Sequence, residues 1–441
     1  MQYIDVQKNI DESKFNFFNF KVLFWCFLII LIDGYDVAIA GVAIPSIMEN
    51  MGVSAVTAGF MVSSALFGMM FGGIFMGSIS EKIGRRWSLS ICIFLFSVFT
   101  AAAGMCDDPY TFSLMRFLAG IGIGGVQPNI TAHMTEYAPK KIRSMMTAIM
   151  FSGYALGAVC AAVLGKQFIL QLGWQVVFYA AALPVILIPF IIKFMPDSML
   201  YMQKKNDRKS LEKALMAINP KLDLSKPYTL KLTEKEQTSS APVIQLFQNG
   251  RALSTVMFWI SITTGLFMVY ALSTWLTKLM AMSGYSLGSS LSFVIALNIG
   301  AIFGSIFCGW LADRFQIKWV VVSMFALGSI FLYMMTLNLP THLLYILIAL
   351  VGSCTTGAQI IAYAFCGQFY PSHIRSTGIG FATGIGRLGA ILAPVIIGII
   401  VNLQLPLEQN FMVIALAGLI GTIALCFIMP QQKTALKTAA V

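Results

Sequence analysis

The sequence predicts an all-α polytopic membrane protein, with twelve transmembrane helices arranged in two pseudo-symmetric bundles of six. The first observation is composition: 58% of the 441 residues are hydrophobic, only 11% are charged, and the mean hydropathy is +0.81. A soluble domain could not bury so much apolar surface. The second observation is that several sequence features recur at one constant separation, as positions 81 and 313 do, 232 residues apart.

Twelve apolar stretches of about 18–26 residues follow one another, and each is long enough to cross a bilayer. They begin near Val22, Thr57, Trp87, Tyr110, Ser144, Trp174, Arg251, Ser286, Lys318, His342, Ser376 and Leu407. A polar stretch divides them, so we expect an N-terminal bundle over 1–192, a cytoplasmic linker over 193–250, a C-terminal bundle over 251–430 and a cytoplasmic tail over 431–441. Within the linker, Ser210–Ile218 has the pattern of a short amphipathic helix that Asn219-Pro220 ends.

The net charge of +11 is a topology signal rather than the mark of a nucleic-acid partner. With the N-terminus inside, 25 of the 29 Lys and Arg residues fall in cytoplasmic segments, the exceptions being Arg116, Lys166, Lys278 and Arg387. That asymmetry follows the positive-inside rule, so both termini are expected in the cytoplasm. The eight cysteines show no metal-ligand spacing, and the sequence predicts no metal and no cofactor.

The recurring features indicate that the two halves share an ancestor. Glycine, acid, base and tryptophan align between Gly77–Trp87 and Gly309–Trp319, and the same separation relates Pro139–Ser144 to Pro371–Ser376. Two six-helix bundles related by an axis along the membrane normal form a binding site between them near the midplane of the bilayer.

These segments also resemble a known family. Gly77–Arg86 is similar to the signature loop of the major facilitator superfamily, and Asp313-Arg314 resembles its second copy. Within that superfamily, Asp33-Gly34-Tyr35-Asp36, Glu136–Pro139 and Gly384–Ile391 resemble the aromatic acid:proton symporter family of benzoate and 4-hydroxybenzoate transporters. The resemblance covers nearly the whole chain. It implies a monomeric transporter, not an enzyme, that imports an aromatic carboxylate with protons across the bacterial cytoplasmic membrane by alternating access.

Two aspartates inside the first apolar stretch are the leading candidates for proton coupling. Asp33 and Asp36 share one helix face, and a charge at bilayer depth costs about 3 kcal/mol or more. Arg116 in the fourth stretch comes to a similar depth as Asp36, so Asp36 is the stronger candidate and Asp33 a second titrating group or a local stabiliser. A permanent structural ion pair is the alternative. Glu136 is a fourth candidate, although a gating contact or an ordinary salt bridge would also suit its place near the cytoplasm.

Arg387 near the middle of the eleventh stretch is the leading candidate for binding cargo. Its counterpart 232 residues earlier is Ala155, so the second half alone has a guanidinium at this point. In a low dielectric a guanidinium binds a carboxylate with two hydrogen bonds. The alternative is a polar partner within its own bundle. Five other residues are expected to line the cavity: Gln127, Asn129, Tyr270, Asn298 and Gln359.

Charged residues in the predicted cytoplasmic loops could gate the transporter. By the resemblance they form a network that holds the inner gate closed, whereas the simpler interpretation is that they anchor the loops at the membrane surface. They are Glu81, Lys82, Arg85, Arg86, Arg143, Asp313, Arg314 and Arg375.

Two other functions compete with symport. A drug/proton antiporter on the same fold would typically carry a Gly-Pro pair in the fifth stretch, and the segment from Phe151 to Gly165 has no proline. A membrane sensor would bind the same ligand without moving it. Counterflow measurements would separate the three.

Overall fold

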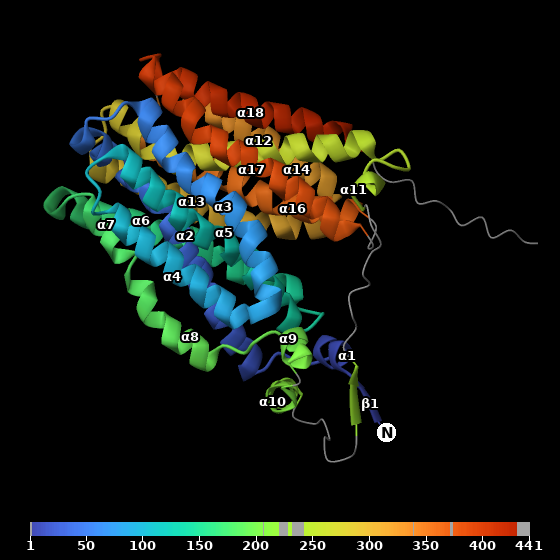
Figure 1. The fold of residues 1–441 in the computed structure, drawn as a ribbon. Coiled ribbons are helices and arrows are strands. Elements are labelled where there is room, and N and C mark those ends of the chain that lie inside the picture. The colour runs from blue at the N-terminus through green and yellow to red at the C-terminus, as the bar shows by residue number, and fades with distance from the viewer. Residues whose placement is uncertain are drawn as a thin grey trace, which may run out of the picture.

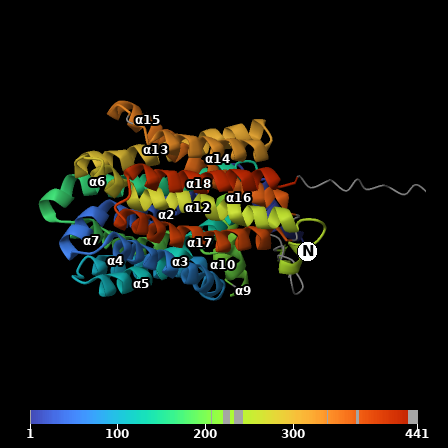
Figure 2. The same cartoon turned by 90° about the horizontal axis from the view of Figure 1, so that it is seen from above.

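The computed structural model describes residues 2–205, 207–219, 228–231, 242–337, 339–370 and 374–429, and it has two helical bundles packed side by side (Figures 1 and 2). The first bundle holds α2 (Phe17–Met51), α3 (Ala55–Ile83), α4 (Arg85–Ala103), α5 (Pro109–Tyr137), α6 (Arg143–Leu172) and a broken sixth span of α7 (Gln175–Ala180), η1 (Leu183–Leu187) and α8 (Ile188–Phe194).

The second bundle repeats this order. It holds α12 (Ala252–Met282), α13 (Leu287–Arg314), α14 (Ile317–Met334), a broken tenth span of α15 (Thr341–Gly352), η2 (Ser353–Gly357) and α16 (Ala358–Phe369), then α17 (Arg375–Asn402) and α18 (Leu407–Phe427). Among the described residues, eleven spans are long and apolar enough to cross a membrane. The remaining one is α5, which has 29 residues and carries Arg116 and several other polar side chains. The twelve predicted spans are confirmed.

Two spans are not continuous α-helices. In the sixth, Pro184 and Pro189 remove backbone donors, and the turn between α7 and α8 tightens into the 3₁₀ segment η1. In the tenth, α15 and α16 are joined by a π-helical turn over Ser353–Gly357. The sequence predicted both spans but neither break.

A layer of short elements covers one end of the first bundle. It contains α1 (Val6–Asp11), α9 (Met199–Lys204) and α10 (Arg208–Ile218), with α11 (Pro242–Gln245) leading into the second bundle. The predicted amphipathic helix is therefore present as α10. Unlike the all-α expectation, β1 (Gln2–Asp5) pairs in parallel with β2 (Tyr228–Lys231). The Asn16 carboxamide donates to the carbonyls of Ala217 and Ile218, each at 2.9 Å, which ties the N-terminal segment to the end of α10.

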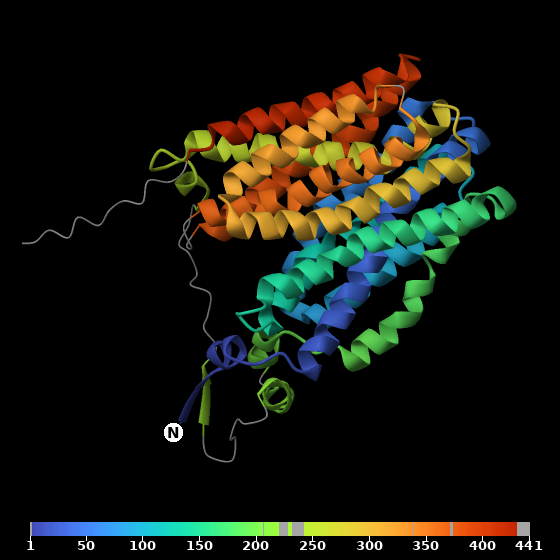
Figure 3. The same cartoon turned by 180° about the vertical axis from the view of Figure 1, so that it is seen from behind.

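We call the end of the molecule that carries this layer the terminal end, and the other the loop end. In the half of the molecule nearer the loop end, two hydrogen bonds join the bundles. Ser63 Oγ of α3 donates to the Ile391 carbonyl of α17 at 2.7 Å, and Lys166 Nζ of α6 donates to Ser292 Oγ of α13 at 2.8 Å. Near the terminal end, a Cβ added at Gly380 or Gly384 of α17 would meet no atom within 4 Å. The bundles therefore meet in the loop half and diverge toward the terminal end (Figures 1 and 3).

Candidate functional site

The site is centred on a buried ion pair within the first bundle. Arg116 Nη1 lies 3.1 Å from Asp36 Oδ2 and 2.9 Å from Thr100 Oγ1, and Nη2 donates to the Asp36 carbonyl at 3.2 Å. Both charged side chains are 1–2% exposed. The ion pair expected from helix depth is present. Asp36 lies on α2, Arg116 on α5, and their neighbour Thr100 on α4.

Glycines allow α6 to pack closely against this part of α2. A Cβ added at Gly34 would overlap the carbonyl oxygen of Tyr154 in α6, and one added at Gly157 would overlap the carbonyl oxygen of Leu31. The two helices therefore cross at the Asp33–Asp36 segment at a separation that only glycine permits. This crossing sets Tyr154 beside Asp33.

Asp33 has a different environment from Asp36. Its side chain is fully buried, and its Oδ2 accepts a hydrogen bond from Gln127 Nε2 at 3.2 Å. Its Oδ1, like that of Asp36, has no hydrogen-bond partner among the described residues. Gln127, which the sequence predicts to contact cargo, donates this hydrogen bond to the Asp33 carboxylate.

Arg387 reaches the interface from the second bundle. Its Nη1 lies 3.8 Å from Met69 Sδ of α3. No carboxylate of the described residues lies within 4 Å of its guanidinium. Its charge acts on Asp33 and Tyr154 of the first bundle and on Tyr363 of its own. Arg387 is thus a half-buried cation at the interface, with no carboxylate of the described residues close enough to pair with it.

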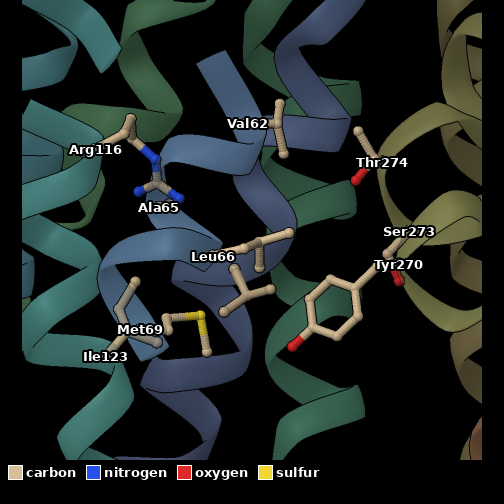
Figure 4. A pocket seen from close by; sticks show the side chains of 10 residues that line it. Val62, Ala65, Leu66, Met69, Arg116, Ile123, Tyr270, Ser273 and Thr274 are labelled. Carbon is tan, nitrogen blue, oxygen red and sulfur yellow. The ribbon is translucent and has the colours of Figure 1, made fainter. Parts of the chain in front are cut away.

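A small pocket lies between the bundles beside these groups (Figure 4). Figure 4 shows Arg116 at one end of it and the Tyr270 ring at the other, with Met69 between α3 and α5. Its volume is about 10 Å³, roughly the room that one water molecule needs, so the bundles must move apart to admit a larger molecule. It is lined by Val37, Val62, Ala65, Leu66, Met69, Arg116, Ile123, Tyr270, Ser273 and Thr274.

Sequence reasoning missed two tyrosines of this region. Tyr154 of α6 interacts with Tyr270 of α12 across the interface, and Tyr363 of α16 lies one turn after Gln359 and beside it. With 14 Tyr in the chain, no pattern singles these two out. Only the i, i+4 spacing of Gln359 and Tyr363 indicates that they share a face.

Two residues expected in the cavity have hydrogen-bond partners within their own bundles. Asn129 is buried between α5 and α4, where its Nδ2 donates to Ser88 Oγ at 3.2 Å and to the Gly125 carbonyl at 2.9 Å. Asn298 donates to the Val294 carbonyl of its own helix at 2.9 Å. These bonds engage the Nδ2 group of each carboxamide, and the role of both residues in binding cargo stays a prediction.

At the terminal end, charged residues of the first bundle form a network. Arg85 Nη2 lies 2.5 Å from Glu136 Oε1. The carboxylate of Asp197 accepts the backbone N–H groups of Arg85 and Arg86 at 2.8 and 3.4 Å, and so caps α4. The Tyr137 hydroxyl donates to the Asp197 carbonyl. Glu136, a candidate for proton coupling, therefore pairs with a loop arginine. Asp197 was not among the site residues expected from the sequence.

The other gating candidates are less connected. Arg143 pairs with Asp11 of α1 at 2.5 Å, and Lys82 is exposed. In the second bundle, Asp313 is exposed, while the Arg314 guanidinium lies over the Trp310 ring at 4.3 Å. The side chains of Glu81 and Arg375 lie outside the described residues.

Residues 26–304 and 289–440 match one family model, that of the Major Facilitator Superfamily. The chain belongs to that superfamily. The solved structure of the E. coli xylose transporter XylE, in a partially occluded inward-open conformation, has the same fold, with a TM-score of 0.72 and 15% identity over 94% of this chain and 99% of XylE.

Relatives narrow the family further. The benzoate transport protein of Acinetobacter baylyi is 41% identical over 96% of this chain and 92% of its own length, and the gallate transporter of Pseudomonas putida is 31% identical over 96% and 94%. Within the major facilitator superfamily, the chain belongs to the family of aromatic acid transporters. It is a multi-pass membrane transporter and not an enzyme.

Proposed function

We propose that this transporter imports an aromatic carboxylate of the benzoate or hydroxybenzoate type together with protons. The observation that carries the proposal is Arg387, a half-buried guanidinium at the interface between the bundles that pairs with no carboxylate of the residues the structure describes. Burying such a charge is costly unless a ligand supplies the missing anion. The relatives that transport benzoate and gallate support an aromatic ring on that anion.

The neighbouring side chains suit such a cargo. The carboxylate would take two parallel hydrogen bonds from Arg387, and the ring would lie among Tyr154, Tyr270 and Tyr363. Gln359 adds a carboxamide on the same side. In this arrangement the anion binds to the second bundle, while both buried aspartates belong to the first.

Alternating access would follow from rocking of the two bundles about the site. The bundles diverge toward the terminal end, and the excess of Lys and Arg at that end supports a cytoplasmic location for it by the positive-inside rule. Closing the cytoplasmic side would bring the ends of α3, α6, α13 and α17 together. We assign the Arg85–Glu136 pair and Asp197 to holding the first bundle's loops rigid during that motion.

The same reasoning supports the proposed domain organisation. Residues 1–192 and 251–430 would move as two bodies in the bacterial cytoplasmic membrane, with 193–250 as the cytoplasmic linker, in a monomer. The link between Asn16 and the end of α10 attaches part of that linker to the first body.

Uptake into proteoliposomes tests the proposal. With the purified protein and an acidic exterior, labelled 4-hydroxybenzoate is expected to accumulate above protein-free liposomes, with saturation. Accumulation only when the interior is acidic would indicate an antiporter, although α6 lacks the proline typical of that class. Saturable binding without flux would indicate a sensor.

A further inference from the structure

Two lysines at the terminal end of the first bundle converge on one aromatic ring. Lys21 near the start of α2 and Lys193 near the end of α8 place their Nζ atoms 5.1 and 5.4 Å from the centre of the Phe194 ring. Neither lysine pairs with a carboxylate of the residues that the structure describes. The ring compensates part of the two positive charges, and the rest is left for an anion.

The two helix ends that carry these lysines lie side by side on the outside of the first bundle (Figures 1 and 3). Only 22% of the apolar stretch of the sixth span, which ends in α8, is buried, the smallest share among the eleven apolar spans of the described residues. Lys193 and Phe194 are exposed, and Lys21 is half-buried. This face of the molecule is therefore turned toward lipid, and the lysines stand where the helices leave the membrane.

Each lysine shares a helix face with an exposed phenylalanine. Phe24 follows Lys21 by three residues on α2, and Phe190 precedes Lys193 by three residues on α8. Because the two helices run in opposite directions, both phenylalanines lie about one turn deeper in the membrane than the lysines. Each phenylalanine is 48% exposed, and the Phe190 ring stacks on that of Phe194 with centres 6.5 Å apart. The surface thus has cations at its edge and apolar rings just below them.

We propose that this surface, formed by Lys21, Phe24, Phe190, Lys193 and Phe194, binds one anionic phospholipid. The phosphate would lie between the two ammonium groups, and an acyl chain would lie along the exposed rings of α2 and α8. A free phosphate ion would satisfy the charges but leave those rings without a partner, which favours a lipid. Basic pockets between helices at the cytoplasmic surface bind anionic headgroups in the same way.

The second bundle has no such surface at the corresponding positions. The residues 232 positions after Lys21 and Lys193 are Leu253 and Leu425. The shared fold therefore does not require these two lysines, and we expect one such lipid site in each molecule.

Binding of lipid to the purified full chain tests the proposal. Native mass spectrometry in detergent compares phosphatidylglycerol with phosphatidylcholine of the same acyl chains, and inorganic phosphate is added as a competitor. One lysine at a membrane surface changes the affinity for an anionic lipid about fivefold, so we expect the first phosphatidylglycerol to bind about 30-fold more tightly than phosphatidylcholine. Inorganic phosphate is expected not to displace it.

Matched variants assign the binding to this surface. Lys21→Gln with Lys193→Gln should raise the dissociation constant for phosphatidylglycerol about 30-fold and leave that for phosphatidylcholine unchanged. The control, Lys209→Gln with Lys213→Gln, removes two exposed lysines of α10 and should change the constant less than twofold. Phe194→Leu keeps both lysines and should raise the constant about two- to fivefold. Thermal unfolding in lipid-free detergent close to that of the wild type shows that the variants are folded.

Photocrosslinking locates the bound lipid. Phosphatidylglycerol with a photoreactive acyl chain, supplied in nanodiscs, should label peptides of α2 and α8 in the wild type and in the α10 control. The label on these peptides should be lost in Lys21→Gln with Lys193→Gln.

Three results would overturn the inference. They are equal affinity of the wild type for the two lipids, an unchanged constant in Lys21→Gln with Lys193→Gln, and displacement of the lipid by inorganic phosphate, which would assign the lysines to a soluble anion. None of these measurements depends on transport, so they test the lipid site independently of the proposed cargo.

Discussion

The two bundles share one fold but place charge differently at corresponding positions. The first bundle has Asp33, Asp36 and Arg116 where the second, 232 residues later, has Gly265, Met268 and Ile348. At the place of Arg387 the first bundle has Ala155. The architecture therefore needs none of these charges, since each bundle folds without the charges of the other.

The helix ends at the terminal end show the same contrast. In the first bundle, Asp197 accepts backbone N–H groups at the start of α4. In the second, Lys318 at the start of α14 donates to the carbonyls of Cys426 and Ile428, at 2.9 and 2.8 Å, where α18 ends. The same pair of helix ends is joined by an acid in one half and by a base in the other. Stability needs the junction but not a particular sign of charge.

The largest effect is expected from breaking the ion pair. Asp36→Asn leaves the Arg116 guanidinium buried without a counterion, which should lower the free energy of unfolding by about 3–5 kcal/mol in detergent. The control exchanges both residues for those of the second bundle, Asp36→Met with Arg116→Ile, and should recover most of the loss. Equal thermal stability of Asp36→Asn and the wild type would show that the Asp36–Arg116 pair does not stabilise the fold.

Helix crossing gives the next comparison. Gly34→Ala places a methyl group on the Tyr154 carbonyl, so we expect a loss of about 3 kcal/mol in the free energy of unfolding. Gly384→Ala in α17 is the matched control, because its methyl group meets nothing within 4 Å. That variant should be as stable as the wild type or up to about 1 kcal/mol more stable. A loss of similar size in both variants would contradict this interpretation, because the close contact exists only at Gly34.

Binding of cargo is expected to depend on the second bundle. Arg387→Ala should raise the dissociation constant for 4-hydroxybenzoate about 30- to 100-fold, equivalent to about 2–3 kcal/mol for a charged hydrogen-bonded contact. Arg387→Lys keeps the charge but not the planar guanidinium, so its dissociation constant should lie between those of the wild type and Arg387→Ala. Isothermal titration calorimetry of the purified wild type and both variants measures the three dissociation constants. An unchanged constant in Arg387→Ala would remove this residue from the site.

The smallest effects are expected at the helix ends. Asp197→Ala removes the cap of α4 and should cost about 1–2 kcal/mol in thermal unfolding. Lys318→Met removes the corresponding donor to α18 and should cost about 0.3–1 kcal/mol. If Lys318→Met were the more damaging of the two, the junction in the second bundle would be the stronger one.

The sequence was sufficient to locate the transmembrane spans and to predict one ion pair, that of Asp36 and Arg116. Continuous apolar stretches located all twelve helices, and counting residues from the helix ends brought Asp36 and Arg116 to one depth. Depth along an axis can be counted, but rotation about the axis cannot, because these helices are apolar on nearly every face. That is why Gln127 was assigned to cargo rather than to Asp33, and why Asn129 was expected in the cavity.

Contacts between distant short segments were also beyond the sequence. β1 and β2 are four residues each and far apart in the chain, and neither carries a pattern that specifies the other. The bonds from Asp197 to the start of α4 depend on how the sixth span ends, and no pattern in the sequence specifies that end. Tyr154 owes its place to the crossing at Gly34, which becomes visible only when both helices are assembled.

The ion pair also has a consequence for how the protein is made. Asp36 and Arg116 are 80 residues apart, so α2 leaves the ribosome well before α5 exists. Until then the first helix carries two carboxylates without a counterion, at about 3 kcal/mol each if they are charged in lipid. We expect α2 to remain beside the insertion machinery until α5 arrives. Nascent chains halted before Arg116 should then crosslink to that machinery through α2, and chains halted after α5 should not.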